Sequence, residues 1–129
     1  DPVEIFDKYR ERGDIVAFKA RDRDCAYGES AAVLSNQMDD RGIVADQMQR
    51  YWDLGYPEHN GLSTTTCILR RHTAKIAEFN DQWWQEIVNG SVRDQLSFDF
   101  VAWKTGVKIG YFDGDHFNSP DFIIRTHGT

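Results

Sequence analysis

A β-branched and apolar run over residues 64–69 is followed closely by a long amphipathic helical pattern that ends at Asn89-Gly90. β-Branched residues favour strands, and Thr73 is a residue type that commonly caps the first turn of a helix. A strand that leads directly into a helix of this length is typical of α/β proteins. The apolar residues of the helix fall on one stripe: Ile76, Phe79, Trp83 and Ile87.

The rest of the chain repeats this alternation of strands and helices. It predicts one α/β domain over residues 1–129, with a small mixed sheet flanked by helices. Periodicity and breaker residues predict the following elements: a helix from Pro2 that ends by Gly13, a strand over 14–19, a loop over 20–28, helices over 29–38 and 43–54, an exposed loop over 55–61, a strand over 64–69, helices over 73–88 and 91–103, and strands over 107–112 and 122–124.

The stretch that begins at Ser91 carries two patterns. Ser91-Val92-Arg93-Asp94 matches the capping box that opens helices, with the helix extending towards Trp103. Leu96, Phe98 and Phe100, however, alternate with polar residues as they would in a strand. Helical spacing of the apolar residues favours the helix: Val92, Leu96, Phe100 and Trp103.

The net charge of −6 argues against a nucleic-acid partner, because phosphate backbones are bound by clustered Lys and Arg. A small phosphorylated ligand needs only a local positive pocket. Arg21 with Arg23, or Arg70 with Arg71, could supply one. Solvated surface arginines are the more common state of such pairs.

Cys25 and Cys67 are the two cysteines, and they do not form a Cys-x-x-Cys pair. We expect two buried thiols in a reducing compartment, with one disulfide as the alternative. No signal peptide is recognisable, and no apolar run approaches the ~20 residues that cross a bilayer. These features predict a cytoplasmic protein without a membrane span.

Several site types have no support in the sequence. The chain has no GxGxxG, Walker A or GxSxG motif, and its four histidines lack the spacing of a zinc site. Asp113-Gly114-Asp115-His116 could hold a hard cation through Asp113, Asp115 and His116. A polar turn after a strand is the better interpretation of this segment.

Arg93-Asp94-Gln95 is the strongest candidate for chemistry. The carboxylate of Asp94 can accept paired hydroxyl hydrogen bonds, Gln95 can donate and accept, and the Arg93 guanidinium can form a fork with phosphate. The amides and dipole of a helix start add a favourable site for anions. The alternative is that Asp94 only completes the helix cap.

Two other places could contribute to the same pocket. His59 and Asn60 precede Gly61 in a flexible loop and supply side-chain donors. Trp83 belongs to the core stripe, so the adjacent Trp84 faces another direction and could stack on a sugar ring. Packing at the rim of the core is the more common role for such a tryptophan.

Taken in order, several segments resemble the glycosyltransferase-like domain of plant mucilage and cell-wall proteins and of bacterial polysaccharide loci. The most specific are residues 79–84 (Phe-Asn-Asp-Gln-Trp-Trp) and 91–98 (Ser-Val-Arg-Asp-Gln-Leu-Ser-Phe). The resemblance covers most of the chain, roughly residues 14–112. The other matching segments are 14–19, 23–29, 47–51, 55–57, 60–62 and 69–72.

The resemblance implies part of a GT-A type nucleotide-sugar transferase fold, a nucleoside-diphosphate sugar donor, a glycan acceptor and a divalent metal (Mn²⁺ or Mg²⁺). Asp94 would contact the donor sugar or the acceptor hydroxyl, with Arg93 and Gln95 beside it. Arg70-Arg71-His72 would follow a strand end and approach phosphate. The metal ligands are not identifiable, because the Asp-x-Asp motif and the nucleotide-binding strands of that fold would lie before residue 1.

The first functional hypothesis is therefore transfer of a sugar from a nucleotide donor to a glycan, centred on Arg93-Asp94-Gln95. The alternative is a shortened, non-enzymatic relative that binds a glycan or pairs with another chain, including a second copy of itself, through Trp84, Tyr56 and His59. A metal-dependent hydrolase that uses the 113–116 turn is a more distant third.

Overall fold

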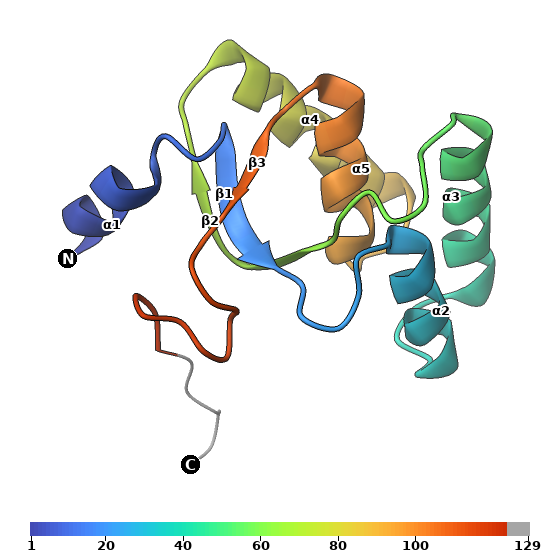
Figure 1. The fold of residues 1–129 in the computed structure, drawn as a ribbon. Helices are drawn as coiled ribbons and strands as arrows, with labels where there is room; N and C mark the ends of the chain where they lie inside the picture. Colours follow the sequence, from blue (N-terminus) through green and yellow to red (C-terminus); the bar gives the residue numbers. More distant parts are fainter. Residues whose placement is uncertain (124–129) are drawn as a thin grey trace.

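The computed structural model describes residues 1–123, which form five α-helices and a three-stranded sheet (Figure 1). The predicted α/β class with a small mixed sheet is confirmed. In chain order the elements are α1 (Pro2–Tyr9), β1 (Ile15–Lys19), α2 (Ala26–Ser35), α3 (Arg41–Asp53), β2 (Ser63–Arg70), α4 (Ala74–Asn89), α5 (Gln95–Thr105) and β3 (Ile109–Tyr111).

β1 is the central strand of the sheet, whose strand order is β2-β1-β3. It runs antiparallel to β2, with Ile15 opposite Arg70, and parallel to β3, with Ile15 opposite Ile109. Because β1 and β3 point the same way, the loops that follow them leave the sheet at the same edge. This edge holds the candidate site.

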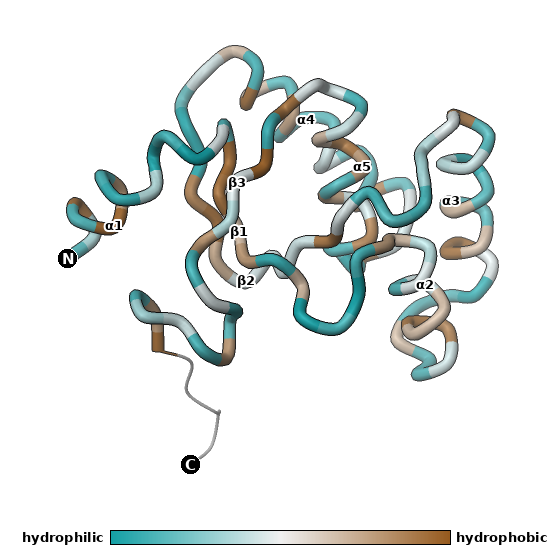
Figure 2. Tube along the Cα trace, viewed as in Figure 1, coloured by the Kyte–Doolittle hydropathy of each residue, from teal (hydrophilic) through white to brown (hydrophobic). Residues whose placement is uncertain are grey.

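Both faces of β1 are buried, and each face belongs to a different hydrophobic cluster. Ile15 and Ala17 pack in the larger cluster with residues from α2, α3, α4 and α5. Val16 and Phe18 face the opposite side, because successive side chains of a strand alternate, and pack with Tyr9 of α1. Figure 2 shows the strands as mostly hydrophobic and the loop between β1 and α2 as hydrophilic.

Three helices begin at residues whose side chains accept a hydrogen bond from a first-turn amide: Asp1, Asp40 and Thr73. The predicted cap at Thr73 is confirmed, since its hydroxyl accepts from the amide of Ile76 at 3.2 Å. α2 has no such cap at Cys25 and begins inside the segment predicted as a loop. Burial of its apolar face, rather than a strong start signal, accounts for this helix.

The helix predicted after Ser91 exists, but the predicted capping box is wrong. α5 begins at Gln95, and the side chain of its N-cap residue Asp94 bonds to none of the helix amides. Ser91 is fully buried; its hydroxyl donates to Asp39 and its amide donates to Gln47 at 2.9 Å. Ser91 is therefore held by residues that are distant in the sequence and does not cap α5.

The end of the described chain departs from the predicted strands. β3 covers only three residues of the predicted 107–112 strand. Residues 122 and 123 form no strand, and residue 124 of that prediction lies outside the described residues. Instead, the ring of Phe122 packs 5.6 Å from that of Phe18 and 5.0 Å from that of Phe112. Phe122 therefore packs against the hydrophobic core without belonging to a strand.

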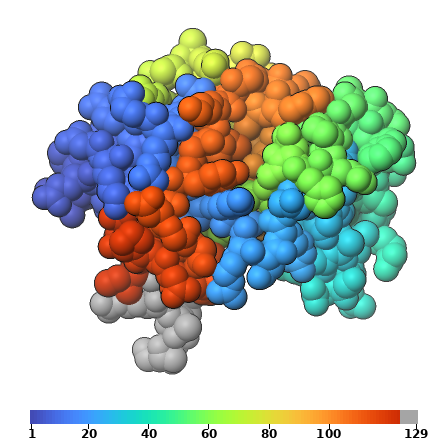
Figure 3. Space-filling model, viewed as in Figure 1, coloured from blue at the N-terminus to red at the C-terminus, as the bar shows by residue number. Residues whose placement is uncertain are grey.

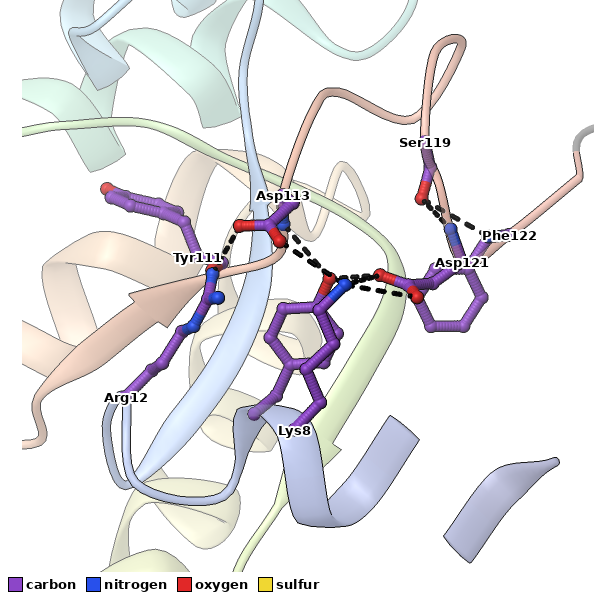
Figure 4. Close-up of polar contacts among 8 residues, drawn as sticks. Lys8, Arg12, Tyr111, Asp113, Ser119, Asp121 and Phe122 are labelled. Carbon is purple, nitrogen blue, oxygen red and sulfur yellow. Dashed lines mark hydrogen bonds and ion pairs between the residues drawn. The ribbon is translucent and has the colours of Figure 1, made fainter. Parts of the chain in front are cut away.

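A polar cluster joins α1 to this C-terminal segment (Figure 4). The ammonium of Lys8 lies 3.0 Å from the carboxylate of Asp121 and 3.3 Å from that of Asp113. Asp113 also pairs with Arg12 at 2.7 Å, and the hydroxyl of Tyr9 donates to Asp121. These contacts hold α1 and the C-terminal segment together beside the smaller hydrophobic cluster.

Candidate functional site

A cleft of about 350 Å³ lies at the edge of the sheet where β1 and β3 end. Ligands of α/β proteins commonly bind at the carboxyl ends of strands. In Figure 3 the blue surface that follows β1 lies beside the red-orange surface that follows β3. The lining residues are Ala20, Arg21, Asp22, Arg23, Glu29, Leu62, Thr64, Thr65, Thr66, Arg93, Asp94, Gln95, His116 and Phe117.

Arg93, Asp94 and Gln95 line the cleft together, at the point where α5 begins. The hydroxyl of Thr65 in β2 donates to the Asp94 carboxylate at 3.0 Å. The indole N–H of Trp83 in α4 donates to the backbone carbonyl of Asp94 at 3.2 Å. Asp94 is therefore held from two elements and faces a cavity of ligand size.

Three arginines bring positive charge to this cleft. Arg23 pairs with Glu29 at 3.0 Å, and the guanidinium of Arg21 lies 5.0 Å from the ring centre of Phe117. Arg93 forms no ion pair within residues 1–123. Guanidinium groups bind phosphate oxygens through paired N–H donors, so the arrangement suits a phosphorylated ligand.

His116 lines the same cleft, although the sequence placed it in a separate polar turn. Its ring lies 3.8 Å from that of Phe117, and its Nδ1 atom is buried without a hydrogen-bond partner among the described residues. A buried nitrogen without a partner is unusual in proteins. The sequence carried no signal for this placement, since it depends on which strands pair.

Asp113 and Asp115 do not converge on a cation site with His116. The carboxylate of Asp113 pairs with Arg12, whereas that of Asp115 accepts hydrogen bonds from the amides of Phe117 and Asn118 at 2.8 and 2.9 Å. Residues 1–123 contain no group of three or more His, Cys, Asp or Glu side chains that could hold a metal ion. The contacts of Asp113 and Asp115 agree with a polar turn, the interpretation that the sequence favoured.

Arg70, Arg71 and His72 line a different cavity, of about 400 Å³, at the start of α4. Arg70 donates to the side-chain oxygen of Asn80 at 2.9 Å, and Arg71 donates to the carbonyl of Arg10. This cavity shares no lining residue with the Asp94 cleft. Of the two arginine pairs noted in the sequence, Arg21 and Arg23 are the pair beside Asp94.

His59, Asn60 and Trp84 also lie outside the lining of the cleft. The Nδ1 atom of His59 is 2.7 Å from the carboxylate of Asp24, and this contact raises the pKa of His59 and lowers the pKa of Asp24. Trp84 projects from α4 with 62% of its surface exposed, while Trp83 is buried as predicted. The structure therefore does not bring these three residues to Asp94.

Asp99 is a buried acid close to the cleft that the sequence did not single out. Its carboxylate accepts hydrogen bonds from the amide and hydroxyl of Ser63 at 2.9 and 3.1 Å. Ser63 stands between Leu62 and Thr64, both of which line the cleft. Burial raises the pKa of Asp99 to about 6, although the Ser63 hydrogen bonds act in the opposite direction.

Two further observations concern the cysteines and the apolar character of the helices. Both cysteines are free thiols, as predicted, but only Cys25 is buried; Cys67, which was also predicted to be buried, is partly exposed. None of the helices formed by residues 1–123 has the length and apolar composition that a bilayer crossing requires.

The α/β fold brings three guanidinium groups, three carboxylates and an amide into one cleft, and these groups can bind ligands that carry both phosphate and hydroxyl groups. The chain belongs to the TOD1/MUCI70, glycosyltransferase-like domain family, whose family model matches residues 1–119. The resemblance to a glycosyltransferase-like domain is thereby confirmed. Neither the curated proteins nor the solved structures provide a significant match to the chain.

Proposed function

We propose that this chain transfers a sugar from a nucleoside-diphosphate donor to a glycan acceptor. The observation that carries the proposal is the convergence of Arg93-Asp94-Gln95 with Arg21 and Arg23 in one cleft. Membership of a glycosyltransferase-like family supports it. A GT-A type architecture and a requirement for Mn²⁺ or Mg²⁺ belong to the proposal as implications of the resemblance.

In the proposed reaction, the arginines bind the diphosphate of the donor. The bond between the anomeric carbon and the diphosphate oxygen breaks, an acceptor hydroxyl oxygen forms the new bond to that carbon, and the hydroxyl proton is released to solvent water. Negative charge then develops on the departing diphosphate, and fixed guanidinium groups stabilise it. Arg93 is the best placed of the three, because no carboxylate of residues 1–123 forms an ion pair with it.

Asp94 and Gln95 orient the sugar hydroxyls in this scheme. A carboxylate accepts hydrogen bonds from neighbouring hydroxyls, and a carboxamide donates and accepts. The Thr65 hydroxyl occupies only part of the accepting capacity of Asp94, since each carboxylate oxygen has two lone pairs. His116 lines the same cleft and adds an imidazole ring beside these groups.

Thermal unfolding with a panel of nucleoside-diphosphate sugars, with and without Mn²⁺, tests the proposal. One donor at a hundredfold excess over its Kd should stabilise the protein by about 2.7 kcal/mol. Asp94→Asn should lose most of this shift and of any transfer activity. Asp46→Asn, an exposed acid on α3, is the matched control and should behave as the wild type.

The absence of a shift with every donor, in both metal conditions, would overturn the proposal. The alternative would then be a non-enzymatic glycan-binding module. An exposed aromatic surface away from the cleft favours this second function. It is formed by Trp52 and Trp103, which are 58% and 40% exposed.

A further inference from the structure

Three neighbouring hollows lie on the surface formed by α4, α5 and the segment after α3. Their volumes are about 240, 270 and 310 Å³. The first two share Lys104; Leu54 lines the second, and Gly55 lines the third. None of their lining residues also lines the Asp94 cleft. In Figure 3 the green segment after α3 adjoins the orange surface of α5. We call the surface that the lining residues of the three hollows form the α5 groove.

Two exposed tryptophans stand along the α5 groove, Trp103 in the second hollow and Trp52 in the third. A connected set of rings supports them: Trp103 lies 5.3 Å from Tyr56, Tyr56 lies 6.0 Å from Tyr27, and Tyr27 lies 5.8 Å from Trp52. Tyr56, at the centre of this set, is only 2% exposed. The two indole rings are thus held in place by packed tyrosine rings, so that ligand binding would cost less side-chain conformational entropy.

The first hollow is lined mainly by carboxylates and carboxamides of α4. Asp81, Gln82, Gln85 and Glu86 line it, next to Lys104 of α5. Acids accept hydrogen bonds, amides both donate and accept, and an ammonium donates, so these groups match the vicinal hydroxyls of a sugar. The third hollow adds Glu58.

The charges of the α5 groove narrow the choice of ligand. Three carboxylates, those of Asp81, Glu86 and Glu58, face one lining cation, Lys104. Arg50 offsets only the charge of Glu86, through a direct ion pair. An anionic chain such as a polyuronate would meet net repulsion, whereas an uncharged chain of sugars would not.

We propose that the α5 groove binds a neutral, linear glycan, whose sugar rings stack on Trp52 and Trp103 while neighbouring hydroxyls bond to the amides and acids of the first hollow. The apolar face of a pyranose matches an indole, and the hydroxyls around its rim match the polar lining. The proposal rests on the proposed function in one respect: the bound chain is the acceptor, held away from the reacting end.

Affinity electrophoresis in gels that contain a soluble neutral polysaccharide tests this directly. Glucomannan, arabinoxylan and hydroxyethylcellulose are suitable probes, with polygalacturonate as the anionic comparison. We expect at least one neutral polymer to retard the protein and polygalacturonate to have no effect. Trp52→Ala and Gln85→Ala should each weaken the retardation, and loss of the Trp52 ring should raise Kd about tenfold.

Val88→Ala is the control, because Val88 is exposed on α4 but lines none of the three hollows. It should migrate as the wild type. Trp52 and Gln85 are exposed, so their variants should keep the wild-type thermal transition and separate lost binding from lost folding. Trp103→Ala serves as a third variant only if its thermal transition is also unchanged.

Three results would overturn the proposal: no retardation by any neutral polymer, equal retardation of Trp52→Ala and the wild type, or retardation by polygalacturonate alone. Light scattering adds a fourth, since a dimer that Trp52→Ala converts to a monomer would make the groove an interface between copies. Asp94→Asn distinguishes this proposal from the proposed function. It should abolish the response to the donor and leave the retardation intact.

Discussion

The hydroxyl of Thr65 in β2 donates a 3.0 Å hydrogen bond to the carboxylate of Asp94 at the start of α5. This bond crosses from the sheet to the helix, so Asp94 faces the cleft and not the amides of its own helix. A capping carboxylate would face the helix. The contact with Thr65 is therefore not the one that a helix cap would make.

Stability measurements should distinguish Asp94 from Ser91. Asp94→Asn should change the free energy of unfolding by no more than about 0.5 kcal/mol, because the side chain is exposed and caps no helix. Ser91→Ala should cost about 1.5–3 kcal/mol, since it removes a buried hydroxyl bonded to the Asp39 carboxylate. Urea unfolding of both variants gives the comparison. A larger loss for Asp94→Asn would restore the capping-box interpretation.

The buried acid Asp99 should make stability depend on pH in an identifiable way. Its pKa is raised to about 6 from an ordinary value of 3.8, so the folded state binds the proton more tightly than the unfolded state. The resulting stability is fully present below about pH 4 and is lost as the pH rises through 6. A shift of about two pKa units corresponds to roughly 3 kcal/mol.

Asp99→Asn isolates this effect, because the amide keeps the shape of the carboxyl group and cannot ionise. Its oxygen can still accept the hydrogen bond from the amide of Ser63. We expect the unfolding free energy of the variant, relative to wild type, to rise by roughly 3 kcal/mol between pH 4 and pH 7.5. A difference that does not vary with pH would show that the Asp99 carboxyl group titrates normally. Asp46→Asn controls for the general change in net charge.

Local patterns in the sequence were sufficient to predict the order of the elements from α1 to β3, the cap at Thr73 and the burial of Trp83. Each of these features depends on residues within a single helix or strand. The partner of Ser91 was not predictable, because Asp39 is 52 positions away in the sequence. A cap and a tertiary hydrogen bond require the same residue type, and the local pattern cannot distinguish them.

For the same reason, the sequence predicted only some of the residues that line the cleft. Arg93-Asp94-Gln95 formed a contiguous run that could be recognised in the sequence. The addition of Arg21, Arg23 and His116 depends on the parallel pairing of β1 with β3, which are far apart in the chain. Arg70 is the last residue of β2, which is antiparallel to β1, so Arg70-Arg71-His72 lies at the opposite edge of the sheet.

Close backbone contact between β3 and the turn before β1 should make Gly110 sensitive to substitution. A Cβ atom at Gly110 would lie 2.7 Å from the carbonyl carbon and oxygen of Arg12, and backbone atoms there cannot move without disturbing the sheet. Gly110→Ala should therefore cost about 1–3 kcal/mol in urea unfolding. Gly28→Ala is the matched comparison, because Gly28 lies in α2 and its nearest neighbour would be the Cβ of Cys25 at 3.9 Å.

Gly28→Ala should stabilise the protein by about 0.4–1 kcal/mol, since alanine restricts the unfolded chain and fits a helix. The two substitutions add the same methyl group and should act in opposite directions. If Gly110→Ala were neutral, β3 would have to lie farther from Arg12 than in this structure.

The polar cluster at α1 gives a prediction about local opening of the fold. Asp121→Asn weakens the contacts with Lys8 and Tyr9 that join α1 to the C-terminal segment. Amide hydrogen exchange in α1 should accelerate by roughly two- to fivefold, while exchange in the buried helix α5 stays the same. Because the ion pair between Lys8 and Asp121 is partly exposed to solvent, 1 M salt should reduce the difference between variant and wild type.

Asp7→Asn is the control for this experiment. Its carboxylate lies 3.7 Å from Arg10 within the same part of the chain and forms no ion pair with residues 111–123. It should leave exchange in α1 close to that of the wild type. Equal acceleration by both substitutions would mean that net charge, and not the link between Lys8 and Asp121, controls the opening of α1. Acceleration by Asp121→Asn alone would identify this link as the contact that holds α1 against the sheet.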